Sequence, residues 1–115
     1  MEVGIDIEMC ERFKNFDDKN HKVFTQNEVE YAHMRTNPHI HLAGFFCAKE
    51  SVAKALKVGF GAKIWASDIE VLHNNNGAPQ INLSNKKLSD LLDGRKIKIS
   101  ISHTNLIATA VCIIE

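Results

Sequence analysis

The chain of 115 residues lacks the features of a secreted, membrane-spanning or nucleic-acid-binding protein. Acidic residues, Glu2 and Asp6, stand where a secretory signal has a basic start and a long apolar run. No segment approaches the ~18 consecutive apolar residues of a membrane span. The 14 basic and 14 acidic residues cancel, so no overall basic field would attract nucleic acid or an anionic membrane. We therefore expect a cytoplasmic protein that binds neither nucleic acid nor membranes.

Cysteine is scarce, and the nucleotide-binding glycine motifs are missing. Cys10, Cys47 and Cys112 are far apart and form no CxxC pair, which predicts reduced, mostly buried thiols. Neither GxxxxGK[ST] nor GxGxxG is present, so the glycines of segment 57–61 are expected only to close a helix. His39 and His41 precede Cys47, but no second ligand pair has standard spacing. A small zinc-binding or purely structural domain stays open as a minor alternative.

The remaining composition is that of a globular protein, and the first half of the chain predicts one strand and two helices. Hydrophobic residues make up 44% and charged residues 24%, and the length suits one core, so residues 1–115 are expected to form a single domain. Alternation over residues 3–8 predicts a strand with one apolar and one acidic face. Thr25 and Glu28 fit a capping box that opens a helix to about Met34. A longer helix is expected from about His41 to Leu56.

The second half predicts four short strands and one helix. A strand begins near Ile69, the run 74–77 forms a hairpin turn, and residues 79–83 return antiparallel. Ser84 is expected to cap a helix that ends at Leu92. Alternation over 97–102 predicts another strand, and the apolar run 106–114 predicts a buried last strand. The order β-α-α-β-β-α-β-β indicates an α+β fold with helices packed on a mainly antiparallel sheet.

The segment 46–55 is the most informative part of the chain, because its helical pattern separates apolar from ionisable residues. At about 100° per residue, one face collects Phe45, Ala48, Val52, Ala55 and Leu56. The opposite face collects Glu50, Lys54 and Lys57. This face could meet a ligand, although a Glu50–Lys54 pair at i, i+4 is also typical of a plain surface ion pair contributing about 0.3–0.5 kcal/mol.

Two further residues stand out. Asp6 lies within a short apolar strand, where a carboxylate is solvated, paired or bound to a cation, and a solvated strand face is the commonest of these. His103 lies at the start of a turn, where an imidazole can reach an anion or cap backbone groups. Ser102 and His103 point to opposite faces of a strand, so they do not form a nucleophile pair. A serine hydrolase is thereby disfavoured.

The motifs occur in an order that resembles a known family. The segments are Gly4-Ile5-Asp6-Ile7 with Arg12, Thr25-x-x-Glu28, Leu42-Ala43-Gly44, Phe46-x-Ala48-Lys49-Glu50-Ser51-x-x-Lys54-Ala55, Asp68-Ile69-Glu70-Val71, Asn76-Gly77-x-Pro79, and Ile99-Ser100-Ile101-Ser102-His103-Thr104. Each is weak alone, but together they are specific. Over about the whole length, the chain resembles the holo-acyl-carrier-protein synthases, the small bacterial 4'-phosphopantetheinyl transferases.

The resemblance implies a magnesium-dependent reaction. It would transfer 4'-phosphopantetheine from coenzyme A to a serine of an apo acyl carrier protein and release adenosine 3',5'-bisphosphate. Asp6 and Glu50 would hold Mg²⁺, and Glu50 and Lys54 would be catalytic. Lys54 would offset pyrophosphate charge or protonate the leaving group, and a magnesium-bound water, or Glu50 acting through one, would accept the serine proton.

The resemblance also implies binding residues and an assembly. His103 and Thr104 would contact the nucleotide, Arg12 would lie near the docked carrier, and a homotrimer would carry its sites at subunit interfaces. The chain departs from the family pattern in having Phe45 for an arginine, Met9 for a glutamate and Lys57-Val58 for Gly-Thr. We expect Lys57 to compensate for the lost arginine in coenzyme binding. A catalytically silent coenzyme A or nucleotide-binding module is the alternative, which the intact Asp6, Glu50 and Lys54 disfavour.

Overall fold

A computed structural model describes residues 1–115 and confirms the predicted α+β class, with every paired strand antiparallel. Its helices and strands are β1 (Glu2–Met9), α1 (Gln26–His33), α2 (Pro38–Leu56), β2 (Val71–His73), β3 (Pro79–Ile81), α3 (Lys86–Leu92), β4 (Ile97–His103) and β5 (Ile107–Ile114). Three short 3₁₀ helices are η1 (Cys10–Phe13), η2 (Lys19–His21) and η3 (Ala66–Asp68). None of the helices is long and apolar enough to cross a membrane.

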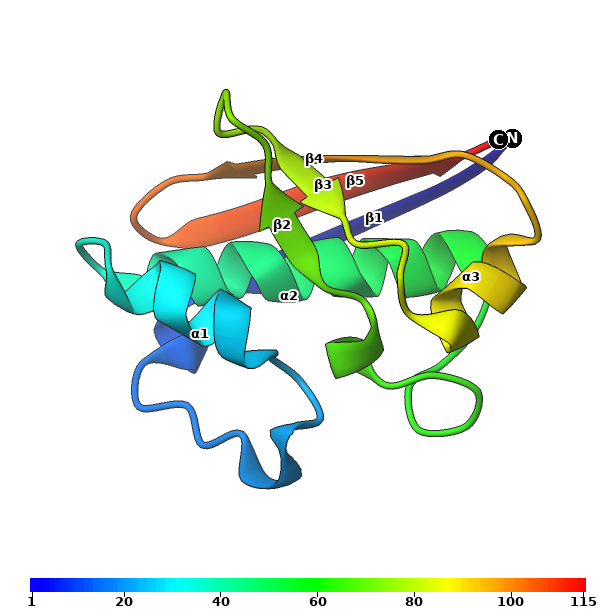
Figure 1. The fold of residues 1–115 in the computed structure, drawn as a ribbon. Coiled ribbons are helices and arrows are strands. Elements are labelled where there is room, and N and C mark those ends of the chain that lie inside the picture. The colour runs from blue at the N-terminus through cyan, green and yellow to red at the C-terminus, as the bar shows by residue number, and fades with distance from the viewer.

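The main sheet has three strands in the order β1-β5-β4, so the last strand of the chain lies at its centre. Glu2 pairs with Ile114, which places the two termini side by side (Figure 1). Strands β2 and β3 form the predicted separate hairpin. Its turn is closed by Asn74 and Gly77, and Gly77 has the positive φ of 81° that favours glycine.

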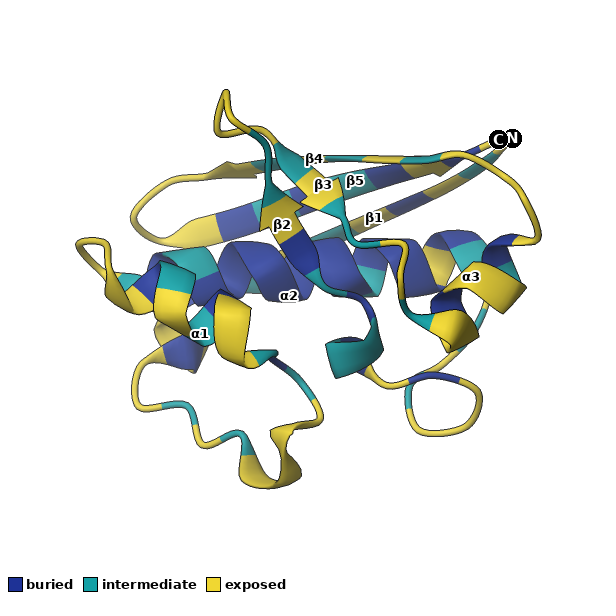
Figure 2. Ribbon diagram, in the orientation of Figure 1, coloured by how far each residue is buried: buried dark blue, intermediate teal, exposed yellow.

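Helix α2 lies at the centre of the molecule, and its burial differs from the prediction. One side packs on the sheet, while η1, α1, β2 and η3 contact other sides, so most of the helix is buried (Figures 1 and 2). The predicted apolar stripe is therefore too narrow, since Cys47, Lys49 and Ser51 are also buried. Glu50 is half-buried and Lys54 exposed, as expected for the other face.

Most predicted element boundaries agree with the structure, and the exceptions have local causes. The capping box of Thr25 and Glu28 is present at the start of α1. Helix α2 begins at Pro38, earlier than expected. Proline is tolerated in the first turn of a helix, because the N–H that it lacks would have no hydrogen-bond partner within the helix. The cap of α3 is Asn85 rather than Ser84, and its side chain accepts a hydrogen bond from the Leu88 N–H.

The two faces of β1 are inverted relative to the expectation that its acids are solvated. Gly4, Asp6 and Glu8 face α2, whereas the apolar side chains of β1 point outward. Only 10% of the Asp6 side chain is exposed, against 63% of Ile5 and 64% of Ile7. The prediction of a buried last strand is only partly confirmed. Strand β5 has one buried face, but its Ile107 and Ile113 are exposed.

A buried ion pair joins the elements around α2. Lys49 lies 2.7 Å from the Glu28 carboxylate, and both side chains are fully buried. Lys49 also donates to the carbonyl oxygens of Ala66 and Ile69, while Glu28 accepts from the Val71 N–H. Burial lowers the pKa of Lys49, and the Glu28 carboxylate opposes that change. Lys49 is therefore a structural residue that fastens α2 to α1 and to the segment before β2.

Candidate functional site

Three carboxylates converge where β1 crosses α2. Asp6 and Glu8 are two residues apart on β1 and share its inward face, and Glu50 approaches them from α2. Burial raises the pKa of Glu50, and repulsion from Asp6 and Glu8 raises it further. Burial raises the pKa of Glu8 as well, with Asp6 adding to the effect. Asp6 and Glu50, the two predicted metal ligands, therefore lie close enough within one protomer to affect each other's ionisation.

Two cations balance the carboxylate cluster. The Lys54 ammonium lies 3.2 Å from Asp6 Oδ1 and donates to the Ile5 carbonyl oxygen at 3.0 Å. Arg12 lies 2.8 Å from Glu8 Oε1, so this residue, expected near the docked carrier, also borders the cluster. The Lys54 side chain is 53% exposed, which leaves it free to turn toward an incoming anion. The site therefore combines a concentration of negative charge with a partly exposed counter-charge.

The residues present suit a magnesium ion. Asp6 Oδ2 is buried and has no hydrogen-bond partner, and such an atom is costly unless a ligand satisfies it. No group of three or more His, Cys, Asp or Glu side chains forms a preformed metal cage. Mg²⁺ does not need one, because it is usually held by one or two carboxylates, with waters and phosphate oxygens completing its shell. Asp6 and Glu50 fit that requirement.

The predicted nucleotide residues lie elsewhere in the protomer. Strand register places His103 opposite Ala108, and Ala108 opposite Glu8, so two strand spacings, about 10 Å, separate the carboxylate edge of the sheet from the histidine edge. Thr104 Oγ1 accepts from the Leu106 and Ile107 N–H groups and so stabilises the turn between β4 and β5. The structure thus brings Asp6, Glu50 and Lys54 together but not His103 or Thr104.

Its helical spacing predicted that Lys57 would share a face of α2 with Glu50 and Lys54. This prediction is wrong. Helix α2 ends at Leu56, and Lys57 adopts the left-handed conformation with φ 60°. Its ammonium lies 3.5 Å from Glu2 Oε2 at the start of β1. The proposed contact between Lys57 and the coenzyme stays a prediction.

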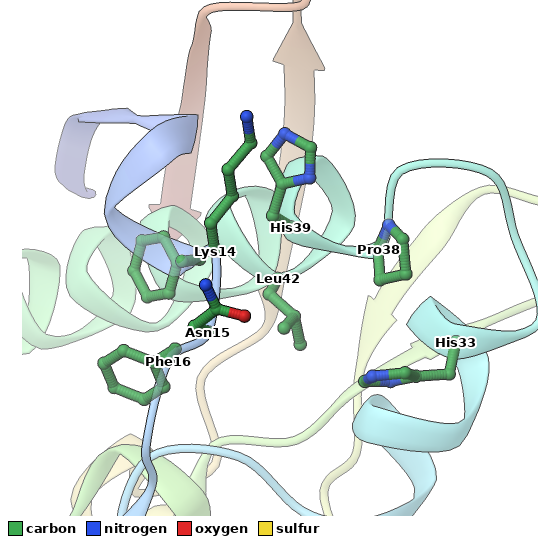
Figure 3. Close-up of a pocket in the computed structure, with 8 residues that line it drawn as sticks. Lys14, Asn15, Phe16, His33, Pro38, His39 and Leu42 are labelled. Carbon is green, nitrogen blue, oxygen red and sulfur yellow. The ribbon is translucent and has the colours of Figure 1, made fainter.

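The zinc alternative is wrong, because no side-chain group is arranged to hold such an ion. His39 lines a cavity of about 360 Å³ between the segment after η1, the end of α1 and the start of α2 (Figure 3). His41 lines a different cavity. Cys47 is buried and its thiol donates to the Ala108 carbonyl oxygen. The three candidate ligands therefore do not share a site.

Sequence reasoning missed Glu8 as a member of the cluster. The sequence did contain a signal for Glu8, because residues two apart on a strand share a face and Glu8 follows Asp6 at that spacing. The alternation was noted, but the acidic face was expected to be solvated. Only the packing of β1 on α2 shows that this face is the inner one.

Comparison with known proteins identifies the family of this chain. Residues 2–112 match the model of the 4'-phosphopantetheinyl transferase superfamily, and the chain belongs to that superfamily. It is 44% identical over 120 residues to the holo-[acyl-carrier-protein] synthase of Caldicellulosiruptor saccharolyticus, covering 98% of this chain and 94% of the relative. A relative from Caldanaerobacter subterraneus with the same name is 41% identical, covering 96% and 91%. Within the superfamily, the chain is a member of the holo-[acyl-carrier-protein] synthase family of enzymes.

Two solved structures share the fold over nearly the whole chain. The Helicobacter pylori holo-[acyl-carrier-protein] synthase in complex with coenzyme A has a TM-score of 0.82 and 30% identity, covering 98% of this chain and 99% of that one. The Bacillus anthracis synthase in complex with CoA (3',5'-ADP) has a TM-score of 0.80 and 29% identity, covering 98% and 94%. The fold predicted from the family resemblance is confirmed.

Proposed function

We propose that this protein transfers 4'-phosphopantetheine from coenzyme A to a serine of an apo acyl carrier protein, and that the reaction depends on magnesium and yields adenosine 3',5'-bisphosphate. The observation that carries the proposal is the convergence of Asp6 and Glu50 around an unpartnered buried oxygen, with Lys54 beside them. The names of the relatives and the coenzyme A complexes of two structural neighbours support the same substrate class.

In this proposal Asp6 and Glu50 hold the metal ion through their carboxylate oxygens. When bound, Mg²⁺ neutralises charge on the pyrophosphate whose bond is broken. Lys54 forms an ion pair with Asp6 and Arg12 with Glu8, so no side-chain cation forms an ion pair with both Asp6 and Glu50. Their mutual repulsion is relieved when a divalent ion enters, which favours binding.

Lys54 has two successive partners in this proposal. Without substrate, it holds the Asp6 carboxylate and the Ile5 carbonyl oxygen. With Asp6 engaged as a metal ligand, the Lys54 ammonium would be available to the pyrophosphate, where it would offset charge or donate a proton to the leaving oxygen. A magnesium-bound water, or Glu50 acting through one, would accept the proton of the carrier serine.

We also propose that the carrier protein docks beside Arg12. The Arg12 guanidinium lies over the Phe46 ring at 4.8 Å, so it stands at the surface on an aromatic support. The cavity of Figure 3 lies close by in the chain and presents Lys14, His33 and His39. A basic surface of this kind suits an acidic carrier protein through electrostatic complementarity.

A homotrimer with sites at the subunit interfaces is part of the proposal. The outward face of β1 and β5 exposes a continuous apolar patch: Val3, Ile5, Ile7, Met9, Ile107 and Ile113. Such patches mark interfaces with other chains. Glu50 and His41 are nine residues apart on α2, about half a turn out of phase and about 13 Å along the axis, so the carboxylates and the histidine region lie on opposite flanks. One coenzyme could engage both kinds of residue if neighbouring subunits supply them.

A cytoplasmic location is consistent with three free cysteines.

The decisive experiment incubates the protein with apo acyl carrier protein, coenzyme A and magnesium, and measures the mass of the carrier. The expected result is a phosphopantetheine adduct that disappears when the metal is chelated and when Asp6→Asn replaces the wild type. Asp90→Asn is the matched control, because it makes the same substitution at an exposed carboxylate of α3 outside the cluster. Binding of coenzyme A without any adduct would instead favour the catalytically silent module.

A further inference from the structure

Glu8 is the member of the carboxylate cluster that the family resemblance did not name. The chain has Met9 where the resemblance led us to expect a glutamate, and its own glutamate stands one position earlier. Neighbouring residues of a strand point to opposite faces, so this shift moves the carboxylate to the face of β1 that packs on α2. Met9 is exposed on the other face. The chain therefore has a third acid beside Asp6 and Glu50.

Arg12 is the cation that pairs with this third acid. Its Nη1 donates to Glu8 Oε1 at 2.8 Å, and neither side chain has another hydrogen-bond partner. The Arg12 guanidinium also lies over the Phe46 ring at 4.8 Å. Phe46 precedes Glu50 by four residues on α2, so the two side chains lie on the same flank of that helix. Arg12 therefore connects β1 with α2 at the edge of the cluster.

The pair has one end inside the cluster and one end at the surface. The Glu8 side chain is 17% exposed and the Arg12 side chain 52%. The pair of Lys86 and Asp90 on α3 has the same spacing of four residues, but both of its side chains are exposed. Solvent screens such a surface pair strongly and a partly buried carboxylate much less. A change at the exposed end of Arg12 is therefore felt at the carboxylates.

Arg12 weakens the negative potential of the cluster. Burial raises the pKa of Glu8, the hydrogen bond from Arg12 opposes that change, and Asp6 adds to it. Arg12 also opposes the rise in the pKa of Glu50 that burial and the other two acids cause. A positive charge so close to the carboxylates reduces their attraction for a second cation. The cluster is thus held below its full affinity for a divalent ion.

We propose that the pair of Glu8 and Arg12 couples carrier docking to metal binding. The inference rests on the proposed function and states how the site responds to its protein partner. A guanidinium has five donors and binds a carboxylate best through two parallel hydrogen bonds. An acidic side chain of the carrier that binds the exposed end of Arg12 therefore competes with the single bond to Glu8. Release of Glu8 restores its full charge beside Asp6 and Glu50, and the cluster then attracts a divalent cation more strongly.

The coupling acts in both directions. If the docked carrier raises the affinity for the metal, the bound metal raises the affinity for the carrier by the same factor. The protein therefore holds its metal most tightly when the acceptor substrate is in place. Glu8 is a positioning residue in this scheme, because it acts through Arg12 and the charge of the cluster.

Titration of the whole protein with Mn²⁺ tests the coupling without turnover. Mn²⁺ takes the same oxygen ligands as Mg²⁺, and electron paramagnetic resonance counts the free ion. The partner is an apo acyl carrier protein whose acceptor serine is replaced by alanine, and its own Mn²⁺ binding is measured separately and subtracted. We expect saturating carrier to raise the Mn²⁺ affinity about tenfold. At matched ionic strength, Mn²⁺ should raise the carrier affinity by the same factor.

Variants of the pair locate the coupling. Arg12→Gln should raise the Mn²⁺ affinity of the carrier-free protein about fivefold to tenfold, because it removes the opposing cation. Glu8→Gln should reduce the response to the carrier to less than about twofold, and in the double variant Arg12→Gln should change the affinity by less than about twofold. Asp90→Asn, which breaks the exposed pair on α3, is the matched control and should keep the wild-type response. A pair that only stabilised the fold would not alter Mn²⁺ binding in this pattern.

Either of two results would overturn the proposal: an unchanged Mn²⁺ affinity when the carrier saturates the wild type, or a full response in Glu8→Gln. If the unaltered carrier still gains phosphopantetheine in such a case, the proposed transferase activity stands and only the coupling is wrong. If the carrier raises the Mn²⁺ affinity through Glu8 but is never modified, the coupling stands and the transferase activity is wrong.

Discussion

Gly4 of β1 lies directly against the backbone of α2 at Ser51. A methyl group at Gly4 would overlap the Ser51 carbonyl oxygen and lie 2.8 Å from the Ala55 amide nitrogen. This close approach of strand and helix sets the distance between Asp6, two residues further along β1, and Glu50, the neighbour of Ser51. The glycine of the first motif therefore serves the site by letting two backbones touch.

Gly4→Ala is expected to destabilise the fold by about 3 kcal/mol and to remove metal-dependent activity, because β1 must move away from α2. Chemical denaturation measures the first effect and the carrier-modification assay the second. Gly59→Ala is the control, since a Cβ at Gly59 meets no atom within 4 Å. Equal stability of the two variants would show that β1 can shift without cost.

Lys49 and Lys54 should respond oppositely to the same change. Lys49→Met leaves the buried Glu28 carboxylate without its cation, and we expect a loss of about 3–5 kcal/mol in the free energy of unfolding. Lys54→Met removes an exposed ammonium, so unfolding should change by less than about 1 kcal/mol while turnover falls sharply. Denaturation curves and turnover rates for both variants provide the check. A stable Lys49→Met protein would contradict the structural role assigned to that residue.

Glu50→Gln and Val52→Ala separate chemistry from packing on one helix. Glu50→Gln should abolish most metal-dependent turnover and alter stability by no more than about 0.5 kcal/mol, because it keeps the shape of the side chain and removes repulsion with Asp6. Val52 is fully buried, and its truncation should cost about 1–3 kcal/mol but leave the turnover of the folded fraction unchanged. A Glu50→Gln protein that is strongly destabilised while its folded fraction keeps full turnover would reverse the assignment.

The apolar face of β1 predicts self-association. Replacing Ile5 and Ile7 together with glutamate should convert a trimer, about three times the 12.9 kDa of one chain, into monomers, since two charges cannot be buried without partners. Light scattering coupled to size-exclusion chromatography gives the mass. Met34→Glu, at an exposed position at the C-terminal end of α1, is expected to leave the assembly intact. A wild type that is monomeric at all concentrations would refute the prediction.

The three cysteines should be unreactive in the folded protein. Burial raises the pKa of Cys47 and of Cys112 to about 12, and it also raises the pKa of Cys10. At pH 8 a pKa near 12 rather than about 9 lowers the thiolate fraction about a thousandfold, and the thiolate is the reactive form. A chromogenic disulfide reagent should therefore titrate three thiols quickly only in denaturant. Rapid reaction of the native protein would show that these side chains are accessible.

Much of the fold followed from local patterns in the sequence. The capping box of α1, the turn at Gly77, the alternation of β1 and β4 and the α+β order all depend on interactions within a few residues, which is why they could be predicted. The family resemblance implied that Asp6 and Lys54 share a site, and their side chains lie 3.2 Å apart. These features are determined by the chain itself.

Other features depend on which surfaces meet. The inward turn of the acidic face of β1, the recruitment of Glu8, and the burial of Lys49 all follow from the position of α2 between the sheet and α1. A pattern of period two shows that a strand has two faces, but not which face packs on the rest of the protein. The cavity beside His41 has the same origin, because α1, α2, β2, β3 and β4 all contribute to its lining. The sequence alone determined the elements and the principal acidic residues, while the packing of those elements decided which side chains share a site.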